Sequence, residues 1–220
     1  MNRLSVMIIV GMVFGVFMAW AIVAHAQEEI PVFNGSFEVL PEGVQPEEAL
    51  GKMPYGWSAS PGSLEVTQAV LSDEKAYEGK YSLKISVSEP ATILTASRPI
   101  PIEPGQTYAA MWRIYNVRDL PVYANQLHVY MEFWGSDGGW WGDTDHWSRE
   151  SWEAQRRGSW STSKRLSTTW TTSREFDQWE DVLVIAQAPE NATHVTLSLW
   201  VPRKTLISYV DDIQFGLLDE

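Results

Sequence analysis

Hydrophobic and polar residues alternate through much of the chain, with the period of two that is typical of half-buried β-strands. Turn-forming residues separate the alternating segments. Strands are predicted at residues 64–71, 81–87, 92–102, 108–117, 126–134, 179–188, 194–201 and 206–215. No segment after residue 26 has the period of an amphipathic helix. Two packed antiparallel sheets bury such strands most simply, so we predict an all-β, two-sheet antiparallel β-sandwich.

Strand parity divides the strands at 108–117, 126–134 and 194–201 between a core face and an outer face. In the second of these strands, Val129, Met131 and Phe133 form the core face. The residues that then point outward from the three strands are Arg113, Tyr115, His128, Tyr130, Glu132, Trp134 and Trp200. Rings and hydrogen-bonding groups on one face predict a ligand groove; the alternative is a face that the following segment simply covers.

That following segment, residues 134–172, is rich in tryptophan and poor in aliphatic residues. It holds seven tryptophans in 37 residues between Trp134 and Trp170, including the adjacent Trp140 and Trp141. Indole is a large flat apolar surface with one N–H donor, so exposed indoles are suited to stacking on sugar rings or nucleobases. We interpret the segment as an insertion between two strands, with Trp140 and Trp141 as candidate ligand contacts. The alternative is that these rings pack the loop onto the domain.

The first 26 residues have the pattern of a secretory signal, with Arg3 before an uncharged apolar run and Ala24-His25-Ala26 as a cleavage site. We therefore expect residues 27–220 to form a single secreted domain, extracellular or periplasmic, that is free of the membrane. The alternative is an uncleaved membrane anchor, because the apolar run is long enough to span a bilayer.

The charge of the chain restricts its partners. Its formal net charge is −12, and an acidic surface repels phosphate backbones. Nucleic acid is therefore not expected as a ligand, and neutral ligands are favoured. The chain has no cysteine, so disulfides and thiolate metal sites are excluded.

Short motifs near both ends of the domain occur in a characteristic order. They are Asn34-Gly35-Ser36-Phe37-Glu38, Gly56-Trp57, Ala76-Tyr77-Glu78-Gly79-Lys80-Tyr81-Ser82-Leu83, Pro104-Gly105-Gln106-Thr107-Tyr108 and Tyr209-Val210-Asp211-Asp212-Ile213. In this order the chain resembles carbohydrate-binding modules of the xylan- and β-glucan-binding type, in the galactose-binding-like jelly-roll superfamily. The resemblance covers nearly the whole of residues 27–220, apart from the tryptophan-rich insertion.

The resemblance implies a jelly roll with a structural Ca²⁺ where the two ends of the domain meet. The side chains of Glu38 and Asp212 and the main-chain carbonyls of Ser36 and Lys80 stand at the positions of its ligands. Such hard oxygen ligands from distant segments would tie together a domain that lacks disulfides. The alternative for the aspartate pair is a solvated strand end.

We therefore expect a non-catalytic protein that binds a neutral polysaccharide, β-glucan or xylan, by aromatic stacking. One alternative is a structural or adhesive protein that self-associates or binds a protein through the insertion. Another is a polysaccharide-degrading enzyme, for which Glu132 and the acidic residues of the insertion would supply a carboxylate pair. An ion pair between Arg113 and Glu132 would instead keep that glutamate ionised, so we expect no catalytic residues.

Overall fold

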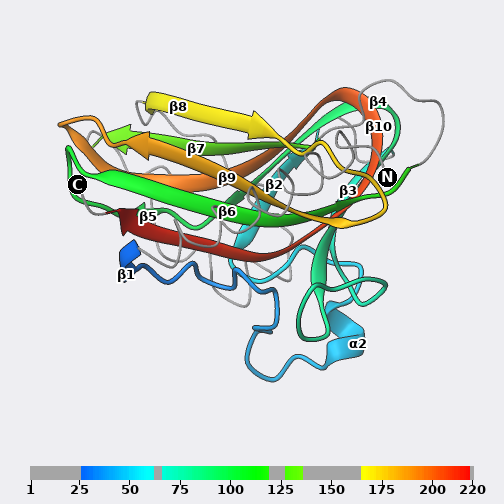
Figure 1. The fold of residues 1–220 in the computed structure, drawn as a ribbon. Coiled ribbons are helices and arrows are strands. Elements are labelled where there is room, and N and C mark those ends of the chain that lie inside the picture. The colour runs from blue at the N-terminus through cyan, green and yellow to red at the C-terminus, as the bar shows by residue number, and fades with distance from the viewer. Residues whose placement is uncertain (1–25, 62–65, 119–126, 136–164, 219–220) are drawn as a thin grey trace, which may run out of the picture.

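The computed structural model describes residues 26–61, 66–118, 127–135 and 165–218, and within them the regular secondary structure is almost entirely β-strand. Figure 1 labels the elements. They are β1 (Ala26–Glu29), α2 (Pro46–Ala49), β2 (Trp57–Pro61), β3 (Thr67–Ser72), β4 (Ser82–Ser97), β5 (Ile100–Pro101), β6 (Thr107–Asn116), β7 (His128–Gly135), β8 (Arg165–Thr172), β9 (Trp179–Gln187) and β10 (Ala192–Leu218). No helix among these residues is long and apolar enough to span a membrane.

Two long strands, β4 and β10, run side by side through both layers of the fold (Figure 1). The first half of β10, residues 192–201, pairs with β7 and with the second half of β4. Its second half, residues 206–217, pairs with β6 and with the first half of β4. The register between β4 and β10 shifts between Val201 and Leu206, and such irregularities let a strand pass from one sheet to another.

The pairing therefore defines two sheets. Sheet I has the order β8-β7-β10-β4-β2, with β5 added beside the start of β10. Sheet II has the order β9-β6-β10-β4-β3, with β1 beside the end of β10. All these pairs are antiparallel.

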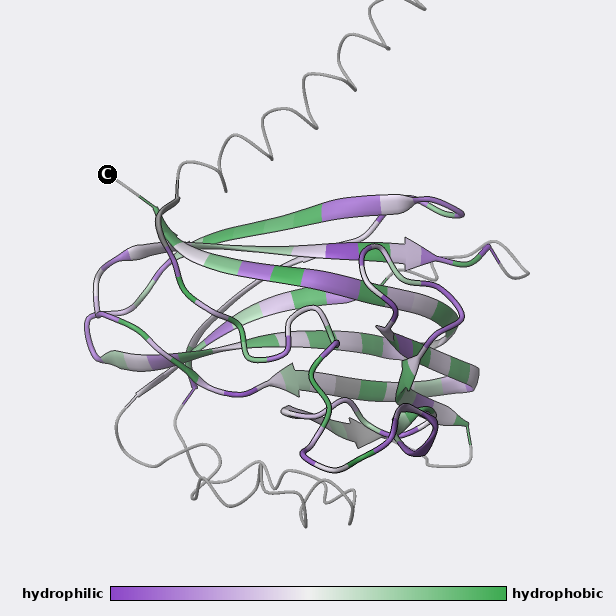
Figure 2. Cartoon of the chain, turned by 90° about the horizontal axis from the view of Figure 1, so that it is seen from below, coloured by the Kyte–Doolittle hydropathy of each residue, from purple (hydrophilic) through white to green (hydrophobic). Residues whose placement is uncertain are grey.

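The core lies between the two sheets and is built by the alternation that the sequence shows. Figure 2 displays the alternating hydrophobic and hydrophilic bands along the strands. Val129, Met131 and Phe133 of β7 are fully buried, as predicted, and so are Trp112 and Ile114 of β6. The predicted fold class and the predicted core faces of these strands are confirmed.

The two ends of the domain meet at the second half of β10. The amide of Ile30 donates to the carbonyl of Phe215, and the amide of Ile213 donates to the carbonyl of Gly35. A Cβ atom at residue 35 would lie 2.5 Å from the carbonyl oxygen of Ile213. Only glycine allows this close approach of the two backbones.

Several predicted boundaries differ from the structure. Residues 81–87 and 92–102 were expected as two strands but belong largely to the continuous strand β4, and β10 likewise contains both 194–201 and 206–215. The short strands β1 and β2 and the four-residue helix α2 were not predicted.

The predicted insertion at 134–172 is also too long. Trp134 belongs to β7, and residues 165–172 form β8, which pairs with β7 along its length. Hydroxyl-bearing residues dominate β8, so its sequence lacks the apolar alternation of a half-buried strand. The remaining part of the insertion, with Trp140 and Trp141, lies outside the described residues.

Candidate aromatic binding face

Four aromatic side chains gather on the outer face of sheet I, and we name them the aromatic cluster: His128, Tyr130, Trp170 and Trp200. The strand register places them there. Tyr130 of β7 lies directly opposite Trp170 of β8, and His128 lies opposite Trp200 of β10. Side chains at directly opposed positions of antiparallel strands lie on the same face, so three neighbouring strands contribute rings to one surface.

The rings have two orientations. The Trp170 ring is nearly parallel to those of His128 and Tyr130, with centroid distances of 5.2 and 6.0 Å and interplanar angles of 23° and 26°. The Trp200 ring stands across them, at 75° to His128 and 70° to Tyr130. The cluster therefore has a flat part and an upright ring beside it.

Part of the aromatic cluster is open to solvent. Trp170 is 54% exposed, which is unusual for a side chain of this size, and His128, Tyr130 and Trp200 are partly exposed. Burial, with a smaller contribution from the charge of Glu132, raises the pKa of Tyr130 to about 12. The Tyr130 hydroxyl is therefore a neutral group that can donate and accept hydrogen bonds at ordinary pH.

The same face continues into a buried polar group at Glu132 and Trp134. The Glu132 carboxylate accepts hydrogen bonds from Arg165 of β8 and Ser198 of β10, both at 2.7 Å. The Trp134 indole N–H donates to the Thr196 hydroxyl at 3.0 Å. Glu132 is 3% exposed and Trp134 is 5% exposed, and their hydrogen bonds link β7 to β8 and β10.

This geometry corrects part of the predicted site. His128, Tyr130 and Trp200 share a face as predicted, but Trp134 is buried on that face. The ion-pair partner of Glu132 is Arg165, although Arg113 was expected. Trp170 was assigned to the insertion, and only the pairing of β8 with β7 shows that it belongs to the aromatic cluster.

Arg113 and Tyr115 do not lie on this face. They belong to β6, which pairs with β9 and with the second half of β10, so their side chains lie on the outer face of sheet II. Arg113 is 1% exposed, forms ion pairs with Asp181 and Asp212, and lies 4.4 Å from the ring centre of Tyr77. Strand parity predicted correctly that both side chains leave the core, but it does not predict to which sheet a strand belongs.

Tyr115 is part of a second group of rings on sheet II. Its ring contacts Trp179 and Tyr209 at centroid distances of 5.7 and 6.4 Å, both edge to face, and Lys75 lies 4.0 Å above it. These rings meet edge to face and lie beneath residues of the turn between β3 and β4, so they present no flat stacking surface comparable to Trp170.

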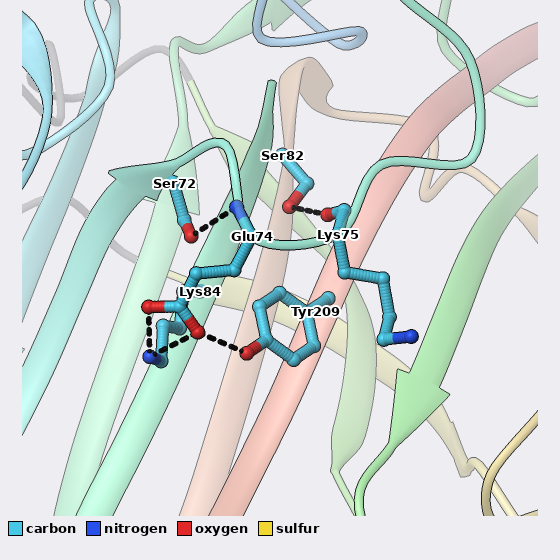
Figure 3. A network of polar contacts seen from close by, with 6 residues as sticks. All are labelled: Ser72, Glu74, Lys75, Ser82, Lys84 and Tyr209. Carbon is cyan, nitrogen blue, oxygen red and sulfur yellow. Dashed lines mark hydrogen bonds and ion pairs between the residues drawn. The ribbon is translucent and has the colours of Figure 1, made fainter. Parts of the chain in front are cut away.

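That turn, residues 73–81, is held to sheet II by the polar contacts shown in Figure 3. The Glu74 carboxylate accepts hydrogen bonds from Lys84 at 2.5 and 2.7 Å and from the Tyr209 hydroxyl at 2.6 Å. The hydrogen bond from Lys84, followed by that from Tyr209, lowers the pKa of Glu74, and burial raises that of Tyr209. Both shifts favour the protonation states that make this contact.

Two carboxylates approach the end of the same turn, where the resemblance implies a cation. Glu38 Oε1 accepts hydrogen bonds from the amides of Lys80 and Tyr81, both at 2.7 Å. Asp211 Oδ2 accepts hydrogen bonds from the amides of Tyr77 and Glu78 at 2.7 and 3.1 Å. Each carboxylate thus links a distant segment of the chain to the turn.

Of the two acidic side chains expected as cation ligands, Glu38 lies at this turn and Asp212 does not. Asp212 forms an ion pair with Arg113, and the aspartate at the turn is its neighbour Asp211. Burial raises the pKa of Asp211 to about 7, and the negative charges of Glu38 and Glu78 add to this effect. Within the described residues no three His, Cys, Asp or Glu side chains are grouped as a metal site, so main-chain carbonyls would have to complete the coordination.

Comparison with known proteins identifies the fold. No family model matches the chain, and no curated protein sequence matches it. The structure is similar to the CBM22-1 xylan-binding domain of Xyn10C from Paenibacillus barcinonensis, with a TM-score of 0.51 and 14% identity over 89% of this chain and 97% of that domain. It is also similar to the enzymatically active domain of tailspike protein 4 of bacteriophage CBA120, with a TM-score of 0.53 and 11% identity. That match covers 74% of this chain and 19% of the tailspike chain. The chain therefore has the β-sandwich fold of a carbohydrate-binding module, and the predicted resemblance is confirmed for the fold.

Proposed function

We propose that this protein is secreted and binds a neutral polysaccharide through the aromatic cluster on sheet I. The observation that carries the proposal is the indole of Trp170, which is 54% exposed on β8 and is backed by the nearly parallel rings of His128 and Tyr130. A flat exposed ring held by its neighbours is prepared for stacking on the C–H face of a sugar, because little side-chain entropy is lost on binding.

The groups beside the rings are suited to sugar hydroxyls. The neutral Tyr130 hydroxyl and the guanidinium of Arg165, whose side chain is 55% exposed, offer hydrogen-bond donors next to the stacking surface. The net charge of −12 disfavours an anionic polymer as the ligand. The xylan-binding domain that shares this fold adds support for a β-linked glycan such as xylan or β-glucan.

We propose that binding leaves the polysaccharide intact. Both oxygens of Glu132 are engaged, one by Arg165 and the other by Ser198, and this stable arrangement suits a structural carboxylate better than a group that transfers protons. Incubation of the protein with β-glucan and xylan should release no reducing sugar. Release above the level of a heat-denatured sample would contradict this part of the proposal.

The binding surface is tested by removing its rings. Trp170→Ala and Trp200→Ala should each lower the affinity for insoluble xylan or β-glucan about 5- to 30-fold, since stacking contributes about 1–2 kcal/mol per ring. Tyr77→Ala, which removes a ring that is 37% exposed near sheet II, is the matched control and should bind normally. Unchanged retention of the Trp170→Ala/Trp200→Ala double variant would refute the proposed site.

We further propose that Ca²⁺ stabilises the junction of Glu38, Asp211 and the turn 73–81. The ion would supply positive charge beside Glu38 and Asp211, and the pKa of Asp211 is raised mainly by burial and further by the negative charges of Glu38 and Glu78. The main-chain carbonyls of Ser36 and Lys80 are the expected additional ligands. All these groups are hard oxygen donors, the type that Ca²⁺ prefers.

A further inference from the structure

The edge strand β9 differs from the edge strands β2, β3 and β8. It pairs with β6 over its whole length, from Thr107 opposite Gln187 to Tyr115 opposite Trp179. No other described strand pairs with its second edge. An unpaired edge exposes backbone N–H and C=O groups that can template a further strand, so folded proteins usually protect such edges.

The outer edges of β2, β3 and β8 carry recognisable protection. The outer edge of β3 is covered because Leu71 exchanges hydrogen bonds with the backbone of Gly51 and Lys52, at 3.0 and 2.6 Å. β2 ends at Pro61, which has no amide hydrogen to donate. β8 presents Ser and Thr residues and the charged Arg165. Each of these three edges thus has a feature that discourages pairing with another chain.

β9 has none of these features along residues 182–186, whose sequence is Val-Leu-Val-Ile-Ala. The segment contains no proline, lysine or charged residue, and Ile185 is 42% exposed on the outer face of sheet II, with the partly exposed Leu183 beside it on the same face. A run of β-branched and aliphatic residues at an open edge is the pattern of a strand that pairs with another.

We propose that β9 pairs in antiparallel orientation with β9 of a second copy of this chain, around a two-fold axis at Val184. In this register Leu183 lies opposite the partner's Ile185 on the outer face, which covers the exposed isoleucine. Asp181 lies opposite the partner's Gln187, so no like charges are opposed. A register centred on Leu183 would instead place the Asp181 carboxylate against the partner's Ile185, which is less favourable.

The start of β9 stays outside this pairing. Glu180 accepts hydrogen bonds from the amides of Arg174 and Glu175 at 2.6 and 3.0 Å, so its side chain is already used to hold the β8–β9 connection. Trp179 contacts Tyr77 and Tyr115 and remains with them. The pairing therefore uses residues 181–187 and leaves these contacts of Trp179 and Glu180 in place.

The two-fold axis that relates two antiparallel strands is perpendicular to the sheet. The outer face of sheet II therefore points in the same direction in both copies. Sheet I of each copy would then lie on the same side of the joined sheet, and both aromatic clusters would face the same way. This consequence rests on the proposed function: a dimer could place two stacking surfaces on one polysaccharide and gain avidity. The pairing itself does not depend on sugar binding.

The molar mass of the purified protein in solution, measured by sedimentation across a hundredfold range of concentration, tests the pairing. We expect a dimer that dissociates on dilution. Ile185→Lys, which places a charge in the paired edge, should stay monomeric at every concentration, whereas Val39→Lys, a change at an apolar residue of similar exposure (45%), should behave like the original chain. A monomer at all concentrations, or a dimer that survives Ile185→Lys, would overturn the proposal.

The register is tested with cysteines, because the chain has none of its own. A mixture of the Leu183→Cys and Ile185→Cys variants should form a disulfide-linked dimer faster than either variant alone, since these two positions face each other across the axis. Equal rates in all three samples would refute the register.

The two proposals can fail separately. Ile185→Lys should bind a soluble oligosaccharide as the original chain does and lose about tenfold or more of the apparent affinity for an insoluble polysaccharide. If the original chain forms the dimer but binds neither the oligosaccharide nor the insoluble polysaccharide, the proposed function is refuted and the proposed pairing is not. If Ile185→Lys and the original chain bind the insoluble polysaccharide with equal affinity, the proposed gain in avidity is refuted.

Discussion

Trp134 and Trp170 stand on neighbouring strands of sheet I, and the same residue type serves different purposes at the two positions. Trp134 is 5% exposed and its indole N–H is satisfied by Thr196, whereas Trp170 is 54% exposed. We expect Trp134→Ala to lower the free energy of unfolding by about 3–5 kcal/mol, because it leaves a cavity and an unpaired hydroxyl. Trp170→Ala should lower it by less than about 1 kcal/mol.

Urea unfolding followed by circular dichroism measures both changes. Similar losses of stability in the two variants would show that Trp170 is also part of the core, and the stacking surface on sheet I would then lose its support.

Gly79 occupies a left-handed conformation in the turn that Glu38 and Asp211 hold. Its φ angle is +66°, and a Cβ atom there would lie 2.4 Å from Glu38 Oε1. Gly79→Ala should therefore destabilise the protein both through backbone strain, of about 1 kcal/mol, and through displacement of the Glu38 carboxylate.

Gly105→Ala is the matched control, since Gly105 has a φ angle of +78° and no atom within 4 Å of the added Cβ. The difference between the two losses of unfolding free energy isolates the contact with Glu38, and we expect it to exceed about 1 kcal/mol. Equal losses would mean that Glu38 contributes little to the turn.

At the scale of elements, β8 is attached to sheet I by a charged contact in addition to its backbone pairing. Arg165 reaches the carboxylate of Glu132, which is almost fully buried. Arg165→Ala should lower the free energy of unfolding by about 1–3 kcal/mol, because it leaves a buried carboxylate without its cation.

Arg118 offers the comparison for this prediction. It pairs with Asp177 at 3.3 Å, but both side chains are more than half exposed, and Arg118→Ala should cost less than about 0.5 kcal/mol. If chemical denaturation showed the two variants to be equally stable, the Arg165–Glu132 pair would be no stronger than a surface contact.

The elements also show how far the sequence predicts the site. Alternation placed His128, Tyr130 and Trp200 on the outside of their strands correctly, because the core face of β7 and of the first half of β10 is uniformly apolar. It could not show that β6 lies in the other sheet, since pairing between strands distant in sequence leaves no trace in local periodicity. Arg113 and Tyr115 were therefore assigned to the wrong face.

The sequence failed to predict β8 for a different reason. β8 lies at the edge of sheet I, and none of its residues is fully buried. Ser and Thr therefore occupy most of its positions, and its sequence does not alternate between apolar and polar residues. With β8 unrecognised, Trp170 could not be placed beside Tyr130, and the most exposed ring of the candidate site was the one the sequence did not identify.

At the scale of the whole molecule, the two ends of the domain and the turn 73–81 meet on the second half of β10 without any disulfide. The segment around Glu38 and the strand that carries Asp211 approach the same turn from opposite ends of the chain. If a cation joins them, its removal should loosen the closure of the domain as a whole. We therefore expect a chelator to lower the melting temperature by several degrees, and added Ca²⁺ to restore it.

Variants of the two neighbouring aspartates make this prediction specific. Asp211→Asn should abolish the effect of the chelator, because it removes a carboxylate that faces the turn and Glu38. Asp212→Asn should remove the ion pair with Arg113 and so lower the starting melting temperature, but the response to the chelator should remain. Differential scanning calorimetry of the original chain and the two variants, each with and without chelator, distinguishes these outcomes. A chelator without effect on the original chain would leave Glu38 and Asp211 as acceptors for backbone amides alone, and the turn would then be held by those four hydrogen bonds and by Glu74.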